Sequence, residues 1–339
     1  MALILWFLFA SVMTASALSP WPQKASTKFS SFRLSQFGFD GTGSSKNGDV
    51  KTSQIFNLDS IRSTLVRQEE TIIFALIERA QYRQNHIIYD AKALDGGAGA
   101  LSANGVPLSF LEFMLLETEK LHSKVRRYTS PEEHAFNPLQ LPPPVLPKLD
   151  YPNLLVSEKG AVDVNVEVMK WYVGKIIDRL CLAGDDEQHG SSVLCDIAAM
   201  QALSRRVHYG KFVAESKFLG DPELYGRLVA EGNVAAIITS LTNVEVERRV
   251  LRRAFVKAST YGQDITGTTE GYKVEPMLIA DIYRDMIIPL TKDVEVRYLF
   301  RRCGQTPPCA TTYFDQCRGP LDAFDDPHAL KELSTPRKR

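Results

Sequence analysis

The sequence lacks the common signatures of metal-dependent and nucleophilic catalysis. Its five cysteines form no CxxC pair and are too sparse for a disulfide scaffold. The six histidines form no HExxH motif, and no serine lies in a GxSxG elbow. The stretch GTGSSKNG at 41–48 does not have the spacing of a phosphate-binding loop. These absences argue against a structural zinc site and against those common catalytic classes.

An excess of charge of one sign is also missing. Forty Lys plus Arg residues balance forty Asp plus Glu residues. The overall charge therefore gives no argument for a nucleic-acid or membrane-surface partner, and any anion site must be local. The 339 residues, 44% of them apolar, are enough for a substantial core in one large domain or two ordinary ones.

The N-terminal segment has the pattern of a targeting sequence. Residues 2–17 are an apolar run too short for a comfortable membrane span, and they end in Ala-Ser-Ala, so 1–17 are interpreted as a signal-like leader. Residues 18–54 are predicted to be a transit-like, disordered linker, because they are rich in serine and have no acid before Asp40. Together they predict delivery to a plastid through the secretory route, with secretion or a cytoplasmic location as alternatives.

The folded part is predicted to be a single all-α domain over residues 55–302. Apolar residues recur at three, four and seven positions from Leu58 to Leu76, which is helical periodicity. Further helices are predicted at 109–127, 163–182, 192–218, 222–231, 233–240, 243–261 and 276–302. The proline-rich segment 137–152 is interpreted as an extended surface connection, and 303–339 as a C-terminal tail without periodicity.

One predicted helix carries an unusual gathering of basic residues. The stretch ALSRRVHYGKFVAESK, 202–217, has five basic side chains in sixteen positions. On an ideal helix Arg206 and Lys217 lie within about 20° of the same direction and about 16 Å apart along the axis. Gly210 and Val213 lie between them, which would leave room for a small anion. The alternative is that both side chains cover a neighbouring helix and place their charges in water.

Other polar pairs have the spacing of one helix face. Asn243 and Glu247 are spaced i,i+4, as are Thr291 and Glu295, and Arg62 lies beside the apolar stripe of the first helix. Each pair could equally be a cap or a surface pair. Spacing alone cannot bring four helices together.

Long motifs resemble a known family. The stretches LDSIRSTLVRQEETIIFALIERA, ETEKLHSKVRRYTSPEEHAF, GSSVLCDIAAMQALSRR and IPLTKDVEVRYLFRR resemble, in the same order, the eukaryotic all-helical chorismate mutases of plants and fungi. The resemblance runs from about 55 to 302. It implies a twofold homodimer that converts chorismate to prephenate, in phenylalanine and tyrosine biosynthesis, without metal, cofactor or covalent intermediate.

The resemblance assigns catalytic roles residue by residue. Arg62 and Arg206 would clamp the two carboxylates of chorismate, where planar guanidinium groups form paired hydrogen bonds. Lys217 and Glu295 would meet the ether oxygen as its C–O bond breaks. Glu295 must be protonated to donate there, which burial favours and the ammonium of Lys217 opposes.

Three more positions complete the catalytic set of seven. Asn243 and Glu247 would hold the ring hydroxyl region, and Thr291 would add a polar contact on the final helix.

Two alternatives to an active biosynthetic mutase stay open. One is a catalytically weak regulatory homologue that binds aromatic amino acids, and the other is a secreted mutase.

The same resemblance implies regulation by tyrosine and tryptophan. The effector positions correspond to Arg126, Arg127, Gly190 and Ser191. The alternative for the two arginines is a pair of exposed cations near a helix C-terminus.

The chain departs from the family at its C-terminal end, where Arg297 stands in place of a common acid and 37 residues follow Arg302.

Overall fold

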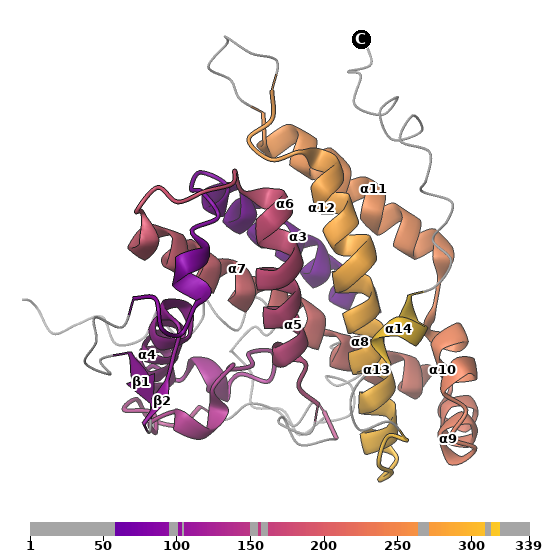
Figure 1. Ribbon diagram of the computed structural model, residues 1–339. Helices are drawn as coiled ribbons and strands as arrows, with labels where there is room; N and C mark the ends of the chain where they lie inside the picture. Colours follow the sequence, from indigo (N-terminus) through magenta and orange to yellow (C-terminus); the bar gives the residue numbers. More distant parts are fainter. Residues whose placement is uncertain are drawn as a thin grey trace, which may run out of the picture. The chain divides into compact units, whose positions relative to one another are not determined.

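The computed structural model describes residues 58–94, 101–103, 105–149, 155–156, 162–263, 271–308 and 313–318. The leader 1–17, the linker 18–54 and most of 303–339 lie outside them. The α-helices are α3 (Leu58–Arg79), α4 (Phe110–Lys124), α5 (Asn165–Trp171), α6 (Ile177–Leu180), α7 (His189–His208), α8 (Gly210–Gly220), α9 (Pro222–Ala230), α10 (Val234–Leu241), α11 (Val244–Tyr261), α12 (Pro276–Ile282), α13 (Ile288–Arg302) and α14 (Phe314–Cys317). Figure 1 shows their arrangement.

The predicted all-α class is confirmed. Within the described residues the strands are a two-residue pair, β1 (Ser102–Ala103) and β2 (Val106–Pro107), joined through Gly105 at φ 77°. Short 3₁₀ turns lie at His86–Tyr89, Arg127–Thr129 and Pro138–Gln140. None of the described helices combines the length and apolar character needed to cross a membrane.

The long helix predicted at 192–218 is interrupted. Helix α7 ends at His208 and α8 begins at Gly210, with Tyr209 at φ −63° and ψ −14° between them. This backbone is still close to helical, so the break is slight. Arg206 and Lys217 therefore lie on different helices, α7 and α8, but the slight break leaves both of them facing α13.

The C-terminal helical segment contains a wide turn with an identifiable cause. Helices α12 and α13 are joined by a π-helical turn, Tyr283–Ile287, and Pro289 follows at the start of α13. Proline has no N–H, and its ring crowds the carbonyl four residues earlier, which here belongs to Asp285. The wide turn accommodates this defect and lets one segment run on to Arg302.

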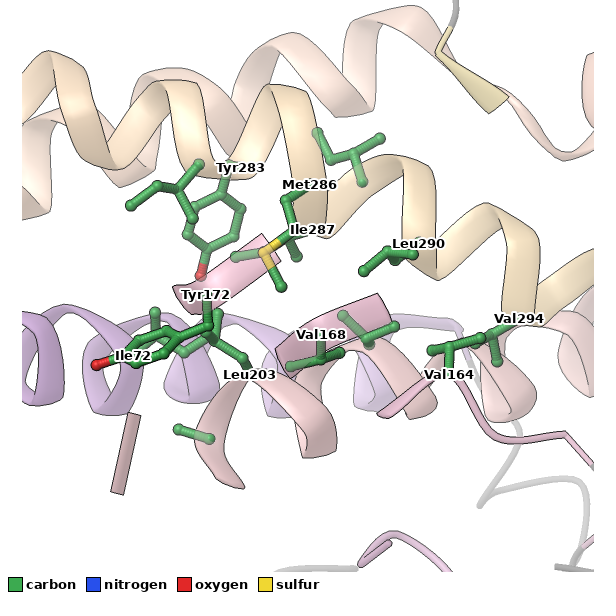
Figure 2. Packing of buried hydrophobic residues seen from close by; sticks show 14 of the residues in the cluster. Ile72, Val164, Val168, Tyr172, Leu203, Tyr283, Met286, Ile287, Leu290 and Val294 are labelled. Atoms are coloured by element: carbon green, nitrogen blue, oxygen red, sulfur yellow. The ribbon is translucent and has the colours of Figure 1, made fainter. Parts of the chain in front are cut away.

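This C-terminal segment lies against the centre of the core. Figure 2 shows Tyr283, Met286, Ile287, Leu290 and Val294 facing side chains of α3, α5 and α7. Their burial removes the apolar surface of the segment from water. The segment that carries Thr291 and Glu295 is thus fixed by packing along its length.

The regions between and beyond the helices partly follow the sequence. Residues 137–149 of the proline-rich segment form one short 3₁₀ turn and otherwise no regular structure, and the Leu139 side chain is fully exposed. This agrees with a surface connection. Beyond α13, however, the chain forms the short helix α14, which packs on α13 and α10.

Candidate active site

Helices α8 and α13 approach closely at Gly210. A Cβ atom on Gly210 would lie 2.8 Å from the Thr291 carbonyl oxygen, 3.1 Å from Thr291 Cγ2 and 3.4 Å from Glu295 Cγ. Only glycine permits this approach. The expectation that Gly210 leaves room for an anion is therefore wrong, because the backbone of α13 occupies that space.

Arg206, in the last turn of α7, reaches α13. Its side chain is 5% exposed, and Nη1 donates to Thr291 Oγ1 at 3.3 Å. The Thr291 hydroxyl in turn donates to the Ile287 carbonyl at 2.6 Å. Arg206 Nε is buried and has no hydrogen-bond partner within the described part of the chain. Burial lowers the pKa of Arg206, which means that its surroundings do not fully compensate its charge.

Lys217 joins three helices at the other end of the site. Its Nζ donates to Glu295 Oε2 on α13 at 3.2 Å and to the carbonyl of Leu241, the last residue of α10, at 2.5 Å. Burial raises the pKa of Glu295 above its ordinary value, while the ammonium of Lys217 opposes that shift. The net direction of these two effects favours the protonated form, which is the form that the predicted role of Glu295 requires.

Glu247 lies on α11 beside this pair. Lys292 Nζ, on α13, contacts Glu247 Oε1 at 2.8 Å, and both side chains are largely buried. Charges of Lys217, Lys292 and Glu247 all act on Glu295. The structure therefore brings five of the seven predicted residues together, and these are Arg206, Lys217, Glu247, Thr291 and Glu295.

The two remaining predicted residues are exposed. Asn243 is the N-cap of α11, where its side chain accepts from the Val246 N–H at 3.1 Å. It lies one helical turn before Glu247. Arg62 lies near the start of α3, and its side chain is exposed, whereas that of Arg206 is enclosed. The carboxylate-binding role of Arg62 stays a prediction.

Sequence reasoning missed a second polar group behind Arg206. Glu69 on α3 is 1% exposed and accepts from Arg253 on α11, at 2.7 Å from Nε and 2.5 Å from Nη2. Tyr283, Glu69 and Arg253 all act electrostatically on Arg206, and the Tyr283 hydroxyl is buried without a partner among the described residues. Glu69 and Arg253 are 184 residues apart, so no local spacing signals their pairing.

A histidine cluster has a composition that could hold a metal ion. Ligand atoms of His134, Asp163 and His208 all lie within 4.8 Å of one another. However, His208 Nε2 accepts from the Val164 N–H at 3.0 Å, and its Nδ1 lies 2.8 Å from the Ser204 carbonyl. These hydrogen bonds use both ring nitrogens of His208. The ring therefore connects α7 to the start of α5 and is better suited to that structural role than to metal binding.

Lys211 occupies the other side of that cluster. Its Nζ lies 2.6 Å from His134 Nε2, and the ring of His134 stacks on that of His208 at 4.1 Å. Lys211 is 1% exposed, and Arg205 contacts Glu133 at 3.2 Å. Both cations therefore pair with groups other than those that Arg206 and Lys217 contact.

The predicted effector residues do not meet within one chain. Arg127 contacts Glu133 at 3.1 Å and Gln201, midway along α7, at 2.7 Å. Gly190 and Ser191 lie in the first turn of α7. Gly190 and Gln201 are eleven residues apart, which is about 16 Å on a helix. Arg126, like Arg127, lies just beyond the C-terminal end of α4, and its Nη1 donates to the Pro147 carbonyl.

A small surface pocket lies elsewhere, between the α5–α6 segment and α12. Its rim carries the ion pair of Arg179 and Asp281 at 2.5 Å. None of the seven predicted catalytic residues lines it. The charged groups between α7, α8, α11 and α13 are a better candidate for chemistry than this pocket.

Known proteins share both the sequence and the fold. The family profile of chorismate mutase type II matches residues 191–296. Chloroplastic chorismate mutase 1 of Petunia hybrida is 43% identical over 261 residues, which cover 75% of this chain and 78% of that protein. The chorismate mutase of Schizosaccharomyces pombe is 42% identical over 247 residues, covering 72% and 96%.

Two solved structures agree with these relatives. The crystal structure of Aro7p chorismate mutase from Candida albicans, in complex with L-Trp, has a TM-score of 0.69 at 42% identity and covers 75% of this chain and 94% of its own. AtCM1 with tyrosine bound in its allosteric site has a TM-score of 0.65 at 42% identity, covering 73% and 96%. On this identity and coverage, the chain belongs to the chorismate mutase family.

Proposed function

We propose that this chain converts chorismate to prephenate at the junction of α7, α8, α11 and α13. The observation that carries the proposal is the buried guanidinium of Arg206, whose Nε has no partner within the described chain, beside the partly buried Lys217–Glu295 pair. A buried cation without a carboxylate is costly. A substrate that brings two carboxylates would supply the missing charge.

The reaction needs positioning and fixed charge. Arg206 binds one carboxylate of chorismate, and Arg62 binds the other. Lys217 and protonated Glu295 donate to the ether oxygen as the C–O bond breaks, so negative charge develops against donors already in place. Burial raises the pKa of Glu295, which favours the protonated form that this hydrogen bond requires.

The polar groups of α11 complete the pocket. Asn243 and Glu247 hold the ring hydroxyl region of the substrate. Lys292 pairs with Glu247 and holds its carboxylate in place. Thr291 contributes through its hydrogen bond with Arg206, which fixes the direction of the guanidinium.

The test is consumption of chorismate by the purified chain, with identification of prephenate as product. Arg206→Ala is expected to lower kcat about a hundredfold to a thousandfold, as loss of a fixed charge stabiliser does. Arg205→Ala is the matched control, because Arg205 is the neighbouring arginine and contacts Glu133 instead. A chain that binds tyrosine but forms no prephenate would support the regulatory homologue.

We further propose a twofold homodimer whose effector sites form between the copies. Arg127 and Gly190 lie far apart in one chain, so a site that uses both needs the α4 end of one copy and the α7 start of another. Apolar side chains are exposed at both places, with Leu121 at 63%, Val125 at 49% and Leu194 at 58%. Burying them against a second copy would stabilise the pair.

Dimerisation can be tested by sedimentation. Leu194→Glu is expected to give monomers and to remove any response of the activity to tyrosine or tryptophan. Val166→Glu is the control, because Val166 is 78% exposed on α5. A dimer that survives Leu194→Glu would place the interface elsewhere.

We propose a plastid as the final compartment, where prephenate feeds phenylalanine and tyrosine synthesis. Relatives from Petunia hybrida and Zea mays are named chloroplastic, which agrees with the transit-like pattern of 18–54. A fluorescent reporter fused to residues 1–54 tests this. Reporter in the medium would favour the secreted mutase.

A further inference from the structure

The chain beyond α13 returns to the surface of that helix. Helix α14 packs against α13 and α10, and the three lie side by side in Figure 1. Tyr313, Phe314 and Cys317 are 2%, 8% and 1% exposed and belong to the main core cluster. We call residues Tyr313–Arg318 the C-terminal clasp.

A buried carboxylate ties the clasp to α13. Asp293, which is 0% exposed, accepts at Oδ1 from the Tyr313 N–H at 2.9 Å and from Arg297 Nε at 3.0 Å. The Arg297 guanidinium also lies 5.9 Å from the centre of the Tyr313 ring. Asp293 lies two residues from both Thr291 and Glu295, which is about 200° around a helix. The clasp therefore holds the face of α13 opposite the candidate active site.

An aromatic contact ties the same segment to α5. The Phe314 ring lies 5.4 Å from that of Trp171, the last residue of α5. The Arg318 guanidinium lies 5.6 Å from the Trp171 ring and 5.4 Å from the Phe314 ring. Aromatic and cation–π contacts of this kind add to the burial of the rings. The clasp thus bridges α5 and α13.

The clasp supports both elements that contact the ammonium of Lys217. Helix α13 presents Glu295 to Lys217, and α10 presents the Leu241 carbonyl. Electrostatic effects of Asp293, Lys292 and Glu295 all reach the buried Cys317 thiol, which agrees with this closeness. A shift of α13 or α10 away from α8 would lengthen one of these two hydrogen bonds.

We propose that the C-terminal clasp is a positioning element of the mutase site, in which Phe314 and the hydrogen bond from Tyr313 to Asp293 hold α13 against α8 without touching the substrate. The inference rests on the proposed mutase function. Reactive geometry tolerates little displacement, since a misplacement of about 1 Å by a distant substitution can cost about a hundredfold in rate. The clasp therefore sets kcat more than substrate binding.

The test uses the full chain with Phe314→Ala. We expect kcat to fall about tenfold to a hundredfold with a smaller change in KM. The amides of 291–299 should exchange with deuterium faster, while those of α4 should not. The pH midpoint of kcat should rise, because Glu295 loses its contact with Lys217. Gln316→Ala is the control, since Gln316 is exposed on the same short helix. Phe314→Leu, which keeps a large apolar side chain at this position, should retain most of the kcat that Phe314→Ala loses.

The outcomes separate positioning from simple stability. If folded Phe314→Ala lowers only the thermal midpoint and leaves kcat, its pH midpoint and the exchange of α13 unchanged, the proposal is overturned. If that variant does not fold, Arg318→Ala decides, because Arg318 is exposed and its loss should lower kcat with faster exchange in α13. An inactive wild-type chain would refute the mutase function, and deuterium exchange would then decide whether the clasp holds α13.

Discussion

Gly210→Ala tests the close approach of α8 and α13 on which the candidate site depends. A Cβ at this position would lie 2.8 Å from the Thr291 carbonyl, a distance that real Cβ atoms essentially never reach. The carbonyl belongs to the helix backbone, so it cannot move aside alone. The two helices must separate by a few tenths of an ångström.

The expected stability change has two opposing parts. Overpacking costs about 1–3 kcal/mol. Replacing a helical glycine by alanine stabilises the helix by about 1 kcal/mol. The net free energy of unfolding should therefore fall by about 0–2 kcal/mol. Gly226→Ala on α9 is the matched control, because its Cβ would meet nothing within 4 Å, and it should stabilise the chain by about 1 kcal/mol without changing kcat.

Activity should respond more than stability does. Separation at Gly210 moves Thr291 from Arg206 and Glu295 from Lys217, so kcat should fall about tenfold or more. Chemical denaturation of both variants gives their free energies of unfolding, and chorismate kinetics give their kcat values. If Gly210→Ala is as stabilising as Gly226→Ala and fully active, the close approach of the helices is refuted.

Three further predictions follow from burial. Activity should fall as the pH rises through the raised pKa of Glu295, whereas Glu295→Gln, whose amide donates at any pH, should show a flat kcat over that range. Arg206→Met should abolish activity yet leave the thermal midpoint equal or higher, because it removes an incompletely compensated buried charge. Burial also holds the pKa of His208 well below its ordinary value. Below pH ~6.5 the unfolded state therefore binds a proton that the folded state refuses, and the free energy of unfolding should fall by up to about 1.4 kcal/mol per pH unit, a slope that His208→Gln should reduce in urea titrations.

The helices could be predicted because their apolar periodicity is local information. The pattern at 243–261 predicted α11, which the structure places at Val244–Tyr261. The break at Tyr209 could not be predicted in this way, since tyrosine is compatible with a helix and the change in ψ is small. The interpretation of Gly210 failed for a related reason. A glycine between two cations indicates space only if no other helix fills it, and that depends on tertiary packing.

The candidate residues could be named from motifs, but their partners could not. The pairing of Lys292 with Glu247 joins α13 to α11, and no spacing along either helix indicates it. The clasp was missed because α14 has only four residues, too few to show a helical period. Its anchors, Phe314 and Trp171, lie 143 positions apart in the sequence.

Helix α13 unites these observations, because nearly every residue from Ile288 to Phe300 is buried. Thr291 and Glu295 face Arg206 and Lys217, Lys292 reaches α11, and Asp293 holds the clasp. A helix enclosed on all sides cannot shift without breaking contacts on several of them. A rearrangement that needs no cofactor depends on donors that are already in place when charge develops, since reorganising them would add to the barrier. Enclosure of α13 supplies that fixed geometry, so substitutions on its outer face should change kcat even though they lie away from the substrate.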